Sequence, residues 1–538
     1  MIRLSLLTQR QCQAQGRRYP ISPARSITVF TPIHSLQSAR AFSTSWRSFI
    51  PESSNTSDGA SSSTETVRAS RSLRVAVIGS GPGGFYTAHR ILKNVSQASI
   101  DMFEALPVPH GLVRFGVAPD HPEVKNVMHT FDEVAQNPNF TFIGNTSVGT
   151  FIAPGSKKAD LEISDLRPHY DAIILAYGAH EDRLLGIPNE QSLKGVMAAR
   201  SFVGFYNGLP SEQDLEIDLS LAETAVVIGQ GNVALDVARI LLTPLDELKK
   251  TDLTEKMIRI LEKSRVKHVH VIGRRGPLEV AFTAKELREM LHLPNTTFHM
   301  DADLLASEME RAGKSLDRPR KRLMGLLEKG IKESKPDQPK SWSLMFLRSP
   351  LGFQGDSTHD QLKAIELGIN HLEGEDHSRK AVATGQKETL ECGLAFRSIG
   401  YKSVGIQGIP FDERRGIVPN MDGKVMDADR NMVPGLYAAG WLKRGPIGVI
   451  ASTMADAYQT GDTIIADWRS GQPMLNSEES ASKEGGEPVL ELLRSKGHKT
   501  VSYEDWKKIE QKEFELGAKV GKPREKFLTT EEMLKAMD

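Results

Sequence analysis

Two glycine-rich stretches have the residue types and the spacing that suit a phosphate-bearing cofactor. The first, Gly79-x-Gly81-x-x-Gly84, follows a run of small and β-branched residues at 74–78. Gly79 would allow a tight turn, Gly81 would let the backbone approach a pyrophosphate, and Gly84 would let the next helix pack closely on the strand. The N-terminus of that helix supplies free N–H groups and a partial positive charge for phosphates. The stretch therefore predicts a dinucleotide site.

The second stretch repeats this pattern further along the chain. Gly229-x-Gly231-x-x-Ala234 follows an apolar run at 225–228, and alanine is a tolerated variant at the third position. A helix is expected to continue from it to about Leu242. Both stretches therefore have the order strand, turn and helix, with which a βαβ nucleotide-binding unit begins.

The residues that follow the next strand of each unit predict different cofactors. Glu104 ends the apolar run at 100–103, where an acid would bind ribose hydroxyls. Arg274 and Arg275 follow the strand expected at 266–272. Arginine forks bind phosphate oxygens bidentately, and the 2′-phosphate of NADP is a dianion. The second site is therefore predicted to bind NADP rather than NAD, the alternative being a solvated arginine pair in a loop.

Two dinucleotide sites in one chain favour a flavoprotein. One site would hold a bound FAD and the other an exchanging NADPH, because a flavin accepts two electrons together and releases them singly. Further strands are expected at 170–176, 394–399 and 435–440, so that the two ends of the chain form one unit. The predicted fold is α/β, with two Rossmann-like dinucleotide-binding domains, the NADP domain being inserted into a discontinuous FAD domain.

The chain is expected to divide at the following boundaries. They are a targeting segment at 1–50, a flexible linker at 51–72, the first part of the FAD domain at 73–177, the NADP domain at 178–401, and the second part of the FAD domain with the C-terminal tail at 402–538.

Longer blocks of the sequence resemble one family. The blocks are residues 107–117 (PVPHGLVRFGV), 118–122 (APDHP), 229–239, 273–290, 441–446 (WLKRGP) and 521–526 (GKPREK). With the glycine stretches, they resemble the mitochondrial NADPH:adrenodoxin (ferredoxin) oxidoreductases from Leu73 to Asp538. The resemblance implies hydride transfer from NADPH to FAD, then release of single electrons to an acidic [2Fe–2S] ferredoxin. It further implies service to iron–sulfur cluster assembly, haem-related steps or cytochrome P450 electron transfer.

The resemblance extends the two predicted cofactor sites to further residues. The FAD site would comprise Gly79, Gly81, Gly83, Gly84, Glu104, Leu112, Val148, Trp441, Gly448, Val449 and Ile450. The NADP site would comprise Gln230, Gly231, Asn232, Val233, Arg274, Arg275, Glu286 and again Gly448. A helix expected to begin near Ile450 would direct its positive end at the reduced flavin.

The family also places a hydrogen-bonded histidine–aspartate pair near the flavin, at positions that match His121 and Asp236. Hydride transfer itself needs no general base. Two interpretations therefore stand side by side, a role in proton movement or orientation that affects rate, and a structural role. No metal site is predicted.

A basic run is the best candidate for docking the acidic ferredoxin. Arg318, Arg320, Lys321 and Arg322 lie close together, and the family's ferredoxin-binding arginines match this run. Since the body of the chain is mildly acidic, docking needs a local basic surface. The alternative is an ordinary solvated start of a helix.

The N-terminus has the composition of a targeting segment. Residues 1–51 contain seven arginines, no lysine and no acid, and such Arg-rich, Ser-rich leaders direct proteins to mitochondria. An unstructured tail and plastid import are the alternatives. The predicted location is the mitochondrial matrix, with peripheral association at the inner membrane but without a transmembrane segment. The acidic remainder of the chain argues against nucleic-acid binding.

The two cysteines restrict the chemistry further. Cys12 would be removed with the targeting segment, which leaves Cys392 alone, so no redox CxxC pair or zinc site is expected. This opposes a disulfide reductase, whereas an NADPH flavoprotein with another acceptor, such as a monooxygenase, stays as an alternative. The second glycine stretch, with its two arginines, opposes a non-catalytic flavin-stabilised assembly subunit.

Overall fold

The computed structural model describes residues 71–538 except 154, 357–359, 376–378 and 476–482. The predicted targeting segment, and all but the last two residues of the predicted linker, lie outside the described residues. Within them, no helix combines the length and the apolar character that crossing a membrane requires.

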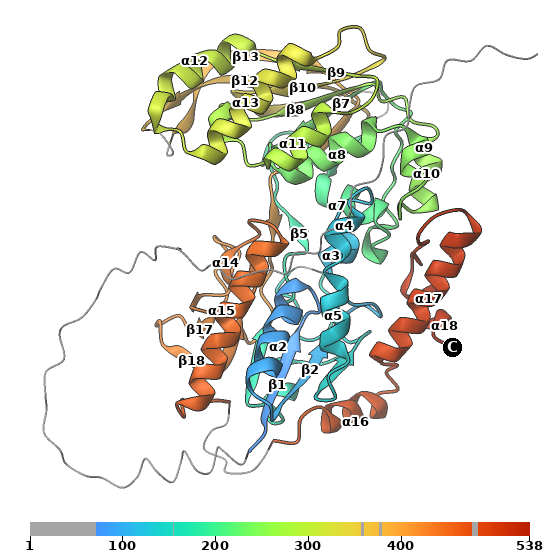
Figure 1. Cartoon of the computed structure of the whole chain (residues 1–538), viewed down its shortest axis with the longest axis vertical. Coiled ribbons are helices and arrows are strands. Elements are labelled where there is room, and N and C mark those ends of the chain that lie inside the picture. Colours follow the sequence, from blue (N-terminus) through green and yellow to red (C-terminus); the bar gives the residue numbers. More distant parts are fainter. Residues whose placement is uncertain (1–70, 154, 357–359, 376–378, 476–482) are drawn as a thin grey trace, which may run out of the picture. The chain divides into compact units, whose positions relative to one another are not determined.

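A seven-stranded sheet, with the helices that cover it, forms what we call the first body (Figure 1). Five adjacent strands are parallel, and two short antiparallel strands extend one edge. In sheet order, the strands are β16 (Asn420–Met421), β17 (Lys424–Met426), β18 (Met432–Ala438), β4 (Ala172–Leu175), β1 (Leu73–Ile78), β2 (Ala98–Phe103) and β3 (Phe140–Ile143). Residues from the two ends of the chain therefore share one sheet, as the sequence predicted.

Alternation along the strands gives the first body a core on each face of its sheet. In β1, Val75 and Val77 face one core while Ala76 and Ile78 face the other, as the period of two in a strand requires. The first core is covered by helices α2 (Pro82–Asn94), α5 (Met128–Ala135) and α15 (Ile450–Arg469). Helices α6 (Ile163–Leu166) and α16 (Glu487–Ser495) pack on the other face.

A six-stranded, all-parallel sheet forms the centre of the second body. In sheet order, its strands are β6 (Val196–Ala198), β14 (Leu394–Arg397), β7 (Thr224–Ile228), β8 (His268–Ile272), β10 (Lys340–Met345) and β9 (Thr296–Met300). The helices of this body are α7 (Ala199–Tyr206), α8 (Asn232–Leu242), α9 (Leu245–Leu248), α10 (Glu255–Leu261), α11 (Ala284–Leu291), α12 (Ala302–Ala312) and α13 (Arg318–Glu333).

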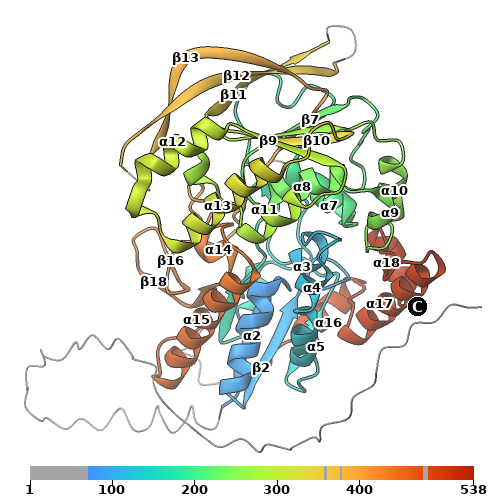
Figure 2. The ribbon, with the colours of Figure 1, turned by 45° about the horizontal axis from the view of Figure 1, so that its top comes forward.

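An antiparallel sheet covers the other face of the second body (Figure 2). Its strands are β11 (Arg348–Gly355), β12 (Leu362–Glu373) and β13 (Lys380–Glu391). Phe353 and Ile365 pack there against Val226 and Ile228 of the parallel sheet. Strands β7 and β14 at the centre of the parallel sheet are thus buried on both faces, which explains their apolar runs.

The chain passes between the two bodies at one place. Strand β5 (Glu181–Asp182) leads into the second body and β15 (Tyr401–Lys402) leads out of it, and the two pair antiparallel. The predicted fold class, with one nucleotide domain inserted into the other, is therefore confirmed. The crossing falls close to the expected boundaries at 177–178 and 401–402, which remain proposals.

The C-terminal tail forms two further helices on one side of both bodies (Figures 1 and 2). They are α17 (Tyr503–Lys519) and α18 (Thr530–Ala536). Trp506 and Met533 of these helices share a small core with Val108 and Phe115 of the first body. Short helices complete the described chain, namely α3 (Leu112–Phe115), α4 (Pro122–Lys125) and α14 (Trp441–Arg444), with 3₁₀ turns at Pro210–Glu212, Pro277–Glu279 and Gly313–Ser315.

Candidate functional site

The first glycine turn joins β1 to α2 and leaves room for a ligand above its middle residue. Gly79 has a φ of 102°, and a Cβ there would lie 2.6 Å from the carbonyl oxygen of Ala176. A Cβ on Gly84 would overlap the carbonyl oxygen of Gly79. At Gly81, by contrast, no described atom lies within 4 Å of a Cβ position. The outer glycines are thus required by the fold, whereas the space at Gly81 fits a pyrophosphate.

The start of α2 has free donors for that pyrophosphate. No side chain caps the helix, and its first turn contains no acid, so the N–H groups at its N-terminus remain available to an anion. A Cβ on Gly83 would lie 3.4 Å from Cα of Gly440, the residue before Trp441. The structure therefore brings the predicted contact Trp441 to the first glycine turn.

Glu104 follows β2, as predicted, but its carboxylate supports the turn. It accepts hydrogen bonds from N–H and Oγ of Ser80, at 3.0 and 2.6 Å, and from N–H of Leu106 at 3.1 Å. Burial raises the pKa of Glu104 above its ordinary value. The ribose contact of this acid remains a prediction.

The remaining FAD candidates come from three segments around this turn. Leu112 begins α3, and a Cβ on the preceding Gly111 would lie 3.2 Å from Cα of Gly81. Val148 is buried in the core of the first body. Gly448 has a φ of 87° and precedes Val449, the N-cap of α15, which carries no side-chain cap. The N–H of Val449 donates to Ser452 Oγ at 3.1 Å, and the contact of this helix start with the flavin remains a prediction.

The second glycine turn, between β7 and α8, has the same construction. Gly229 has a φ of 124°, and a Cβ there would overlap the carbonyl oxygen of Ser398. Gly231 again has no described atom within 4 Å of its Cβ position, and α8 has no side-chain cap. Asn232 accepts a hydrogen bond from N–H of Thr283 at 2.8 Å, and Gln230 lies over Gly273. Val233, the remaining NADP candidate of this turn, is partly buried in α8.

Arg274 and Arg275 follow β8, with fixed backbones and free side chains. Their carbonyl groups accept hydrogen bonds from Asn370 Nδ2 and from N–H of Leu347, each at 3.1 Å. Both side chains are exposed, and neither guanidinium has a hydrogen-bond or ion-pair partner in the described part of the chain. Two unpaired cations next to an open dinucleotide turn fit a 2′-phosphate.

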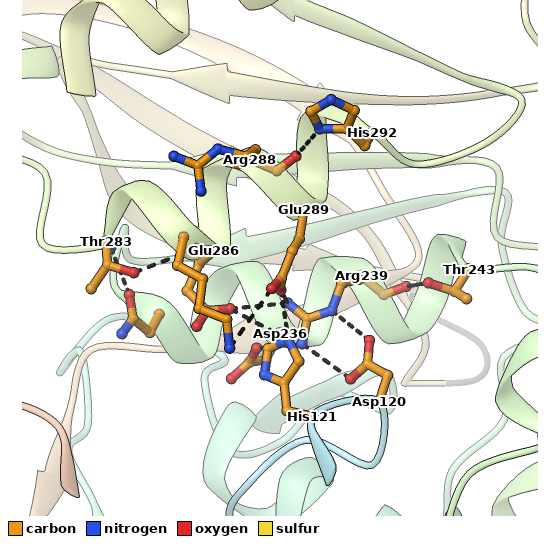
Figure 3. A network of polar contacts seen from close by, with 12 residues as sticks. Asp120, His121, Asp236, Arg239, Thr243, Thr283, Glu286, Arg288, Glu289 and His292 are labelled. Atoms are coloured by element: carbon orange, nitrogen blue, oxygen red, sulfur yellow. Dashed lines mark hydrogen bonds and ion pairs between the residues drawn. The ribbon is translucent and has the colours of Figure 1, made fainter. Parts of the chain in front are cut away.

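A cluster of charged side chains lies where the two bodies meet (Figure 3). Arg239 of α8 is its centre and is only 4% exposed. It donates to Asp120 of the first body at 2.6 Å, to Asp236 one turn earlier in α8 at 2.7 Å, and to Glu286 of α11 at 3.2 Å. His121 Nε2 lies 2.5 Å from Glu289 Oε2. Residues of both bodies therefore share one polar network.

In the described part of the chain, His121 and Asp236 do not form the expected hydrogen bond with each other. Each has a closer partner, Glu289 for His121 and Arg239 for Asp236. One ring nitrogen of His121 and one carboxylate oxygen each of Asp236 and Glu286 nevertheless lie within 4.8 Å of one another, close enough to share a metal ion. The structure thus brings together three predicted site residues, and Arg239 already neutralises part of the charge that a metal ion would neutralise.

Burial and Arg239 set the protonation tendencies of this cluster. Burial raises the pKa of Asp236 and of Glu286 above their ordinary values. For Asp120, burial acts in the same direction, but the hydrogen bond and charge of Arg239 outweigh it and lower the pKa. Neighbouring carboxyls therefore differ in how readily they take up a proton, which suits groups that relay or hold one.

Sequence reasoning did not assign a role to Arg239, Glu289 or Asp120. A signal was present for Arg239, which lies on the otherwise largely apolar helix α8 three residues after Asp236. Buried charges are almost always paired, and a three-residue spacing places both side chains on one helix face. No local signal indicated Glu289, because its partner His121 is 168 residues away.

Comparisons with known proteins identify the family. Residues 73–301 match the pyridine nucleotide-disulphide oxidoreductase family. The mitochondrial NADPH:adrenodoxin oxidoreductase of Bos taurus is 47% identical over 86% of this chain and 92% of its own length. That of Arabidopsis thaliana is 41% identical over 87% and 96%. The chain belongs to the NADPH:adrenodoxin oxidoreductase family.

A solved structure agrees with this assignment. Mycobacterium tuberculosis FprA, determined in complex with NADPH, is similar with a TM-score of 0.78 and 36% identity, over 87% of this chain and all of that one. Membership of the family confirms that the chain is an oxidoreductase enzyme whose cofactors are FAD and NADP. The individual contact residues remain predictions.

The basic run predicted to dock a ferredoxin begins α13 of this NADPH:adrenodoxin oxidoreductase family member. Arg318, Lys321 and Arg322 are exposed, and none has a side-chain partner among the described residues. Arg320 differs from them, because its Nη1 donates to the carbonyl of Val280 at 2.9 Å. Its backbone N–H donates to the side chain of Asp317, which caps the helix. Three of the four cations are therefore free for an acidic partner.

Cys392 is buried next to β14, and burial raises its pKa to about 12. A thiol becomes reactive as a thiolate, and this one stays protonated at neutral pH. Although the matching family is named for disulphide chemistry, the described chain has no second cysteine to form a redox pair.

Proposed function

We propose that the protein accepts hydride from NADPH on FAD and passes single electrons to an acidic [2Fe–2S] ferredoxin. One observation carries the proposal. Two glycine turns have open space at Gly81 and Gly231, and only the second is followed by unpaired arginines. Bound FAD would supply the change from two-electron to one-electron transfer, while the chain binds and orients both dinucleotides.

The residues of the first turn would hold FAD. N–H groups at the N-terminus of α2 would bind its pyrophosphate, with Gly79, Gly83 and Gly84 giving the turn its shape. Glu104 would bind the ribose or, as in this structure, hold Ser80 in place. The other proposed contacts are Leu112, Val148, Trp441, Gly448, Val449 and Ile450.

The residues of the second turn would hold NADPH. Its pyrophosphate would bind at Gln230, Gly231, Asn232 and Val233, and its 2′-phosphate at the paired arginines 274 and 275. Glu286 and Gly448 would lie at the nicotinamide end. Because Glu286 belongs to the network of Arg239, the nicotinamide would be held where the two bodies meet.

His121 and Asp236 would orient the reacting ends of the dinucleotides and handle the proton that remains after electrons leave. Support comes from their proximity and from the raised pKa of Asp236, which burial causes. A structural role remains the alternative. It would be favoured if His121→Gln reduced flavin and ferredoxin at the rates of the unaltered protein.

The ferredoxin would dock on the start of α13. Arg318, Lys321 and Arg322 offer free cations to its acids, while Arg320 ties the helix start to Val280. Opposite charges at the rim of an interface mainly speed encounter and fix orientation. The relatives named above carry adrenodoxin in their names, which supports a ferredoxin of that type.

The proposed location is the mitochondrial matrix, with peripheral association at the inner membrane. The relatives are named mitochondrial, and residues 1–51 have the composition of a targeting segment. Iron–sulfur cluster assembly, haem-related steps and cytochrome P450 reactions would use the electrons there. Import of the full chain into isolated mitochondria, with cleavage within the predicted targeting segment at 1–50, tests the location.

Steady-state reduction of a ferredoxin with NADPH and with NADH tests the activity. Cytochrome c reports the reduced ferredoxin, and a small dye serves as an acceptor that needs no docking. We expect the purified protein to be yellow, to be bleached by NADPH far faster than by NADH, and to reduce cytochrome c only when ferredoxin is present. A protein that reduces the dye but no ferredoxin would belong to the alternative class, an NADPH flavoprotein with another acceptor.

A further inference from the structure

The block at 521–526 has no role in the functions above, yet its side chains Lys522, Arg524 and Lys526 are buried. It belongs to a segment, residues 521–528, that joins α17 to α18. The side chains of Lys522 and Lys526 are each only 1% exposed. Lysines are almost never buried unless they are paired, so the partners of these two indicate what the segment does.

Both lysines have an acidic partner in the second body, and Lys522 is also paired with Glu525 of its own segment. Lys526 Nζ lies 3.1 Å from Asp252 Oδ2, and Lys522 Nζ lies 3.1 Å from Glu255 Oε1. Between the lysines, Glu525 accepts a hydrogen bond at 3.0 Å from N–H of Glu255, the first residue of α10. Three consecutive polar contacts therefore bind the segment to the start of one helix.

The same segment contacts the first body. Lys526 Nζ also donates to the carbonyl of Arg114 in α3, at 3.4 Å. Asp252 is shared with Lys125 of α4, whose Nζ lies 2.7 Å from both carboxylate oxygens. The carboxylate of Asp252 is thus held by two lysine amino groups, one from the first body and one from the tail.

Close packing reinforces these contacts. A Cβ on Gly208, in the second body, would lie 3.4 Å from Cβ of Lys526 and 3.3 Å from Leu528. On the other side, Arg114 pairs with Glu513 of α17 at 2.5 Å, and its guanidinium lies over the ring of Trp506. The tail is therefore fitted between both bodies and not attached to only one of them.

The covalent connection between the bodies leaves them free to move without such a contact. Only the short pair β5 and β15 carries the chain across, and domains joined in this way are expected to move unless an interface holds them. The network around Arg239 is one part of that interface, and the segment at 521–528 is another. Hydride transfer needs the reacting atoms about 3–3.5 Å apart, and an error of ~1 Å costs on the order of 100-fold in rate.

We propose that residues 521–528 form a clamp that fixes the second body over the first, with Lys522 and Lys526 as positioning residues for hydride transfer. The three contacts at Asp252 and Glu255 must form together, and together they define one relative position of the two dinucleotide sites. The kinetic consequence rests on the proposed function, whereas the fixed position of the bodies does not.

The test compares two double variants of the full chain. Lys522→Met/Lys526→Met removes both amino groups of the clamp and keeps the apolar part of each side chain. Lys499→Met/Lys508→Met is the matched control, since those exposed lysines pair with Asp538 and Asp505 inside the tail. Glu255→Gln is a milder third variant that weakens one contact, in case the first double variant does not fold.

The first measurement is the distance between spin labels on the two bodies. Exposed Gln136 and Lys329 are changed to cysteine, in a background with Cys12→Ser, and buried Cys392 does not react. We expect one narrow distance distribution in the unaltered and control proteins, and a distribution at least twice as broad in Lys522→Met/Lys526→Met. Equal widths in both double variants would overturn the proposal.

The second measurement is flavin reduction at saturating NADPH in a rapid-mixing experiment. We expect the clamp variant to be slower by about tenfold or more, with unchanged flavin content and an unchanged rate of chemical reduction by dithionite. A broadened distribution with an unchanged hydride-transfer rate would also overturn the positioning role. If NADPH failed to reduce the unaltered protein, the proposed function would fall, and the distances would still decide whether the clamp exists.

Discussion

Among the described residues, the guanidinium groups of Arg274 and Arg275 have no counter-ion, whereas Glu279 a few residues further on lies 3.8 Å from Arg379. Changing both to alanine should lower kcat/KM for NADPH by about 100-fold or more, because a hydrogen bond to a charged group contributes about 1.5–3 kcal/mol. NADH, which lacks the 2′-phosphate, should be used with kcat/KM within ~3-fold of its original value. Steady-state rates with a dye acceptor measure both, and equal losses for the two coenzymes would contradict a phosphate-binding role.

Lys526 gives the stability of the protein a characteristic pH dependence. Burial lowers its pKa from 10.5 to about 7, in spite of the attraction of Asp252, while Lys125 and Arg114 act with burial. Between pH 7 and about 10, the unfolded chain therefore holds a proton on this lysine that the native chain lacks. Native stability must rise with pH across this window.

The matched variant isolates this contribution. The stability of the unaltered protein minus that of Lys526→Met should increase on the order of 2–4 kcal/mol from pH 7 to pH 10. Lys499→Met, whose side chain is about half exposed, should show no such trend. Denaturation midpoints in urea, at a series of pH values, provide the measurement. A difference independent of pH would show that Lys526 is charged throughout.

At the scale of single elements, the glycines of the first turn have different roles: Gly81 leaves space for the ligand, whereas Gly84 is needed for the fold. The methyl group of Gly81→Ala would enter open space, so the apoprotein's melting temperature should stay within ~2 °C of the unaltered value. The same methyl group should weaken FAD retention, because it fills the pyrophosphate position. Gly84→Ala places a methyl group on the carbonyl of Gly79 and should destabilise the apoprotein by about 1–3 kcal/mol. Thermal unfolding and flavin content after gel filtration distinguish them. Identical behaviour of the two variants would refute this division.

The sequence allowed prediction of elements whose shape depends on local rules. Both strand–turn–helix units were predictable because tight turns need glycine, and central strands such as β4, β7 and β14 were predictable because strands buried on both faces have apolar runs. The parallel strands β3, β6, β9 and β10 were not predicted. Strands β11, β12 and β13 were not predicted. One face of these strands is buried because it packs against Val226 and Ile228 of the parallel sheet. Those residues are far away in sequence, so no local pattern indicates which face is buried.

The same distinction applies to the candidate site. Arg274 and Arg275 could be predicted, since their function depends on the spacing from a strand. The contacts of Arg239, His121 and Lys526 could not, because their acidic partners lie far away in sequence. Lys526 and Asp252 are 274 positions apart in the sequence, and only the fold determines that they meet.

At the scale of the whole molecule, the basic side chains at the start of α13 that are unpaired among the described residues place the predicted ferredoxin-docking surface at one end of that helix. Changing Arg318, Lys321 and Arg322 to glutamate should raise KM for ferredoxin by about tenfold or more and leave reduction of a dye unchanged. Lys329→Glu/Lys332→Glu, at the other end of α13 where both lysines are paired with glutamates, is the control. Rising salt should weaken coupling to ferredoxin in the unaltered protein, and equal loss in the control would contradict a localised surface.

The pairing of β5 with β15 has a consequence for engineering and for descent. Because the entry and the exit of the second body lie side by side, the whole coenzyme-selecting module is grafted onto its host at a single junction. A module with another coenzyme preference could be exchanged there without cutting either sheet. The graft would need acids at the positions of Asp252 and Glu255, so that the host's tail recognises it.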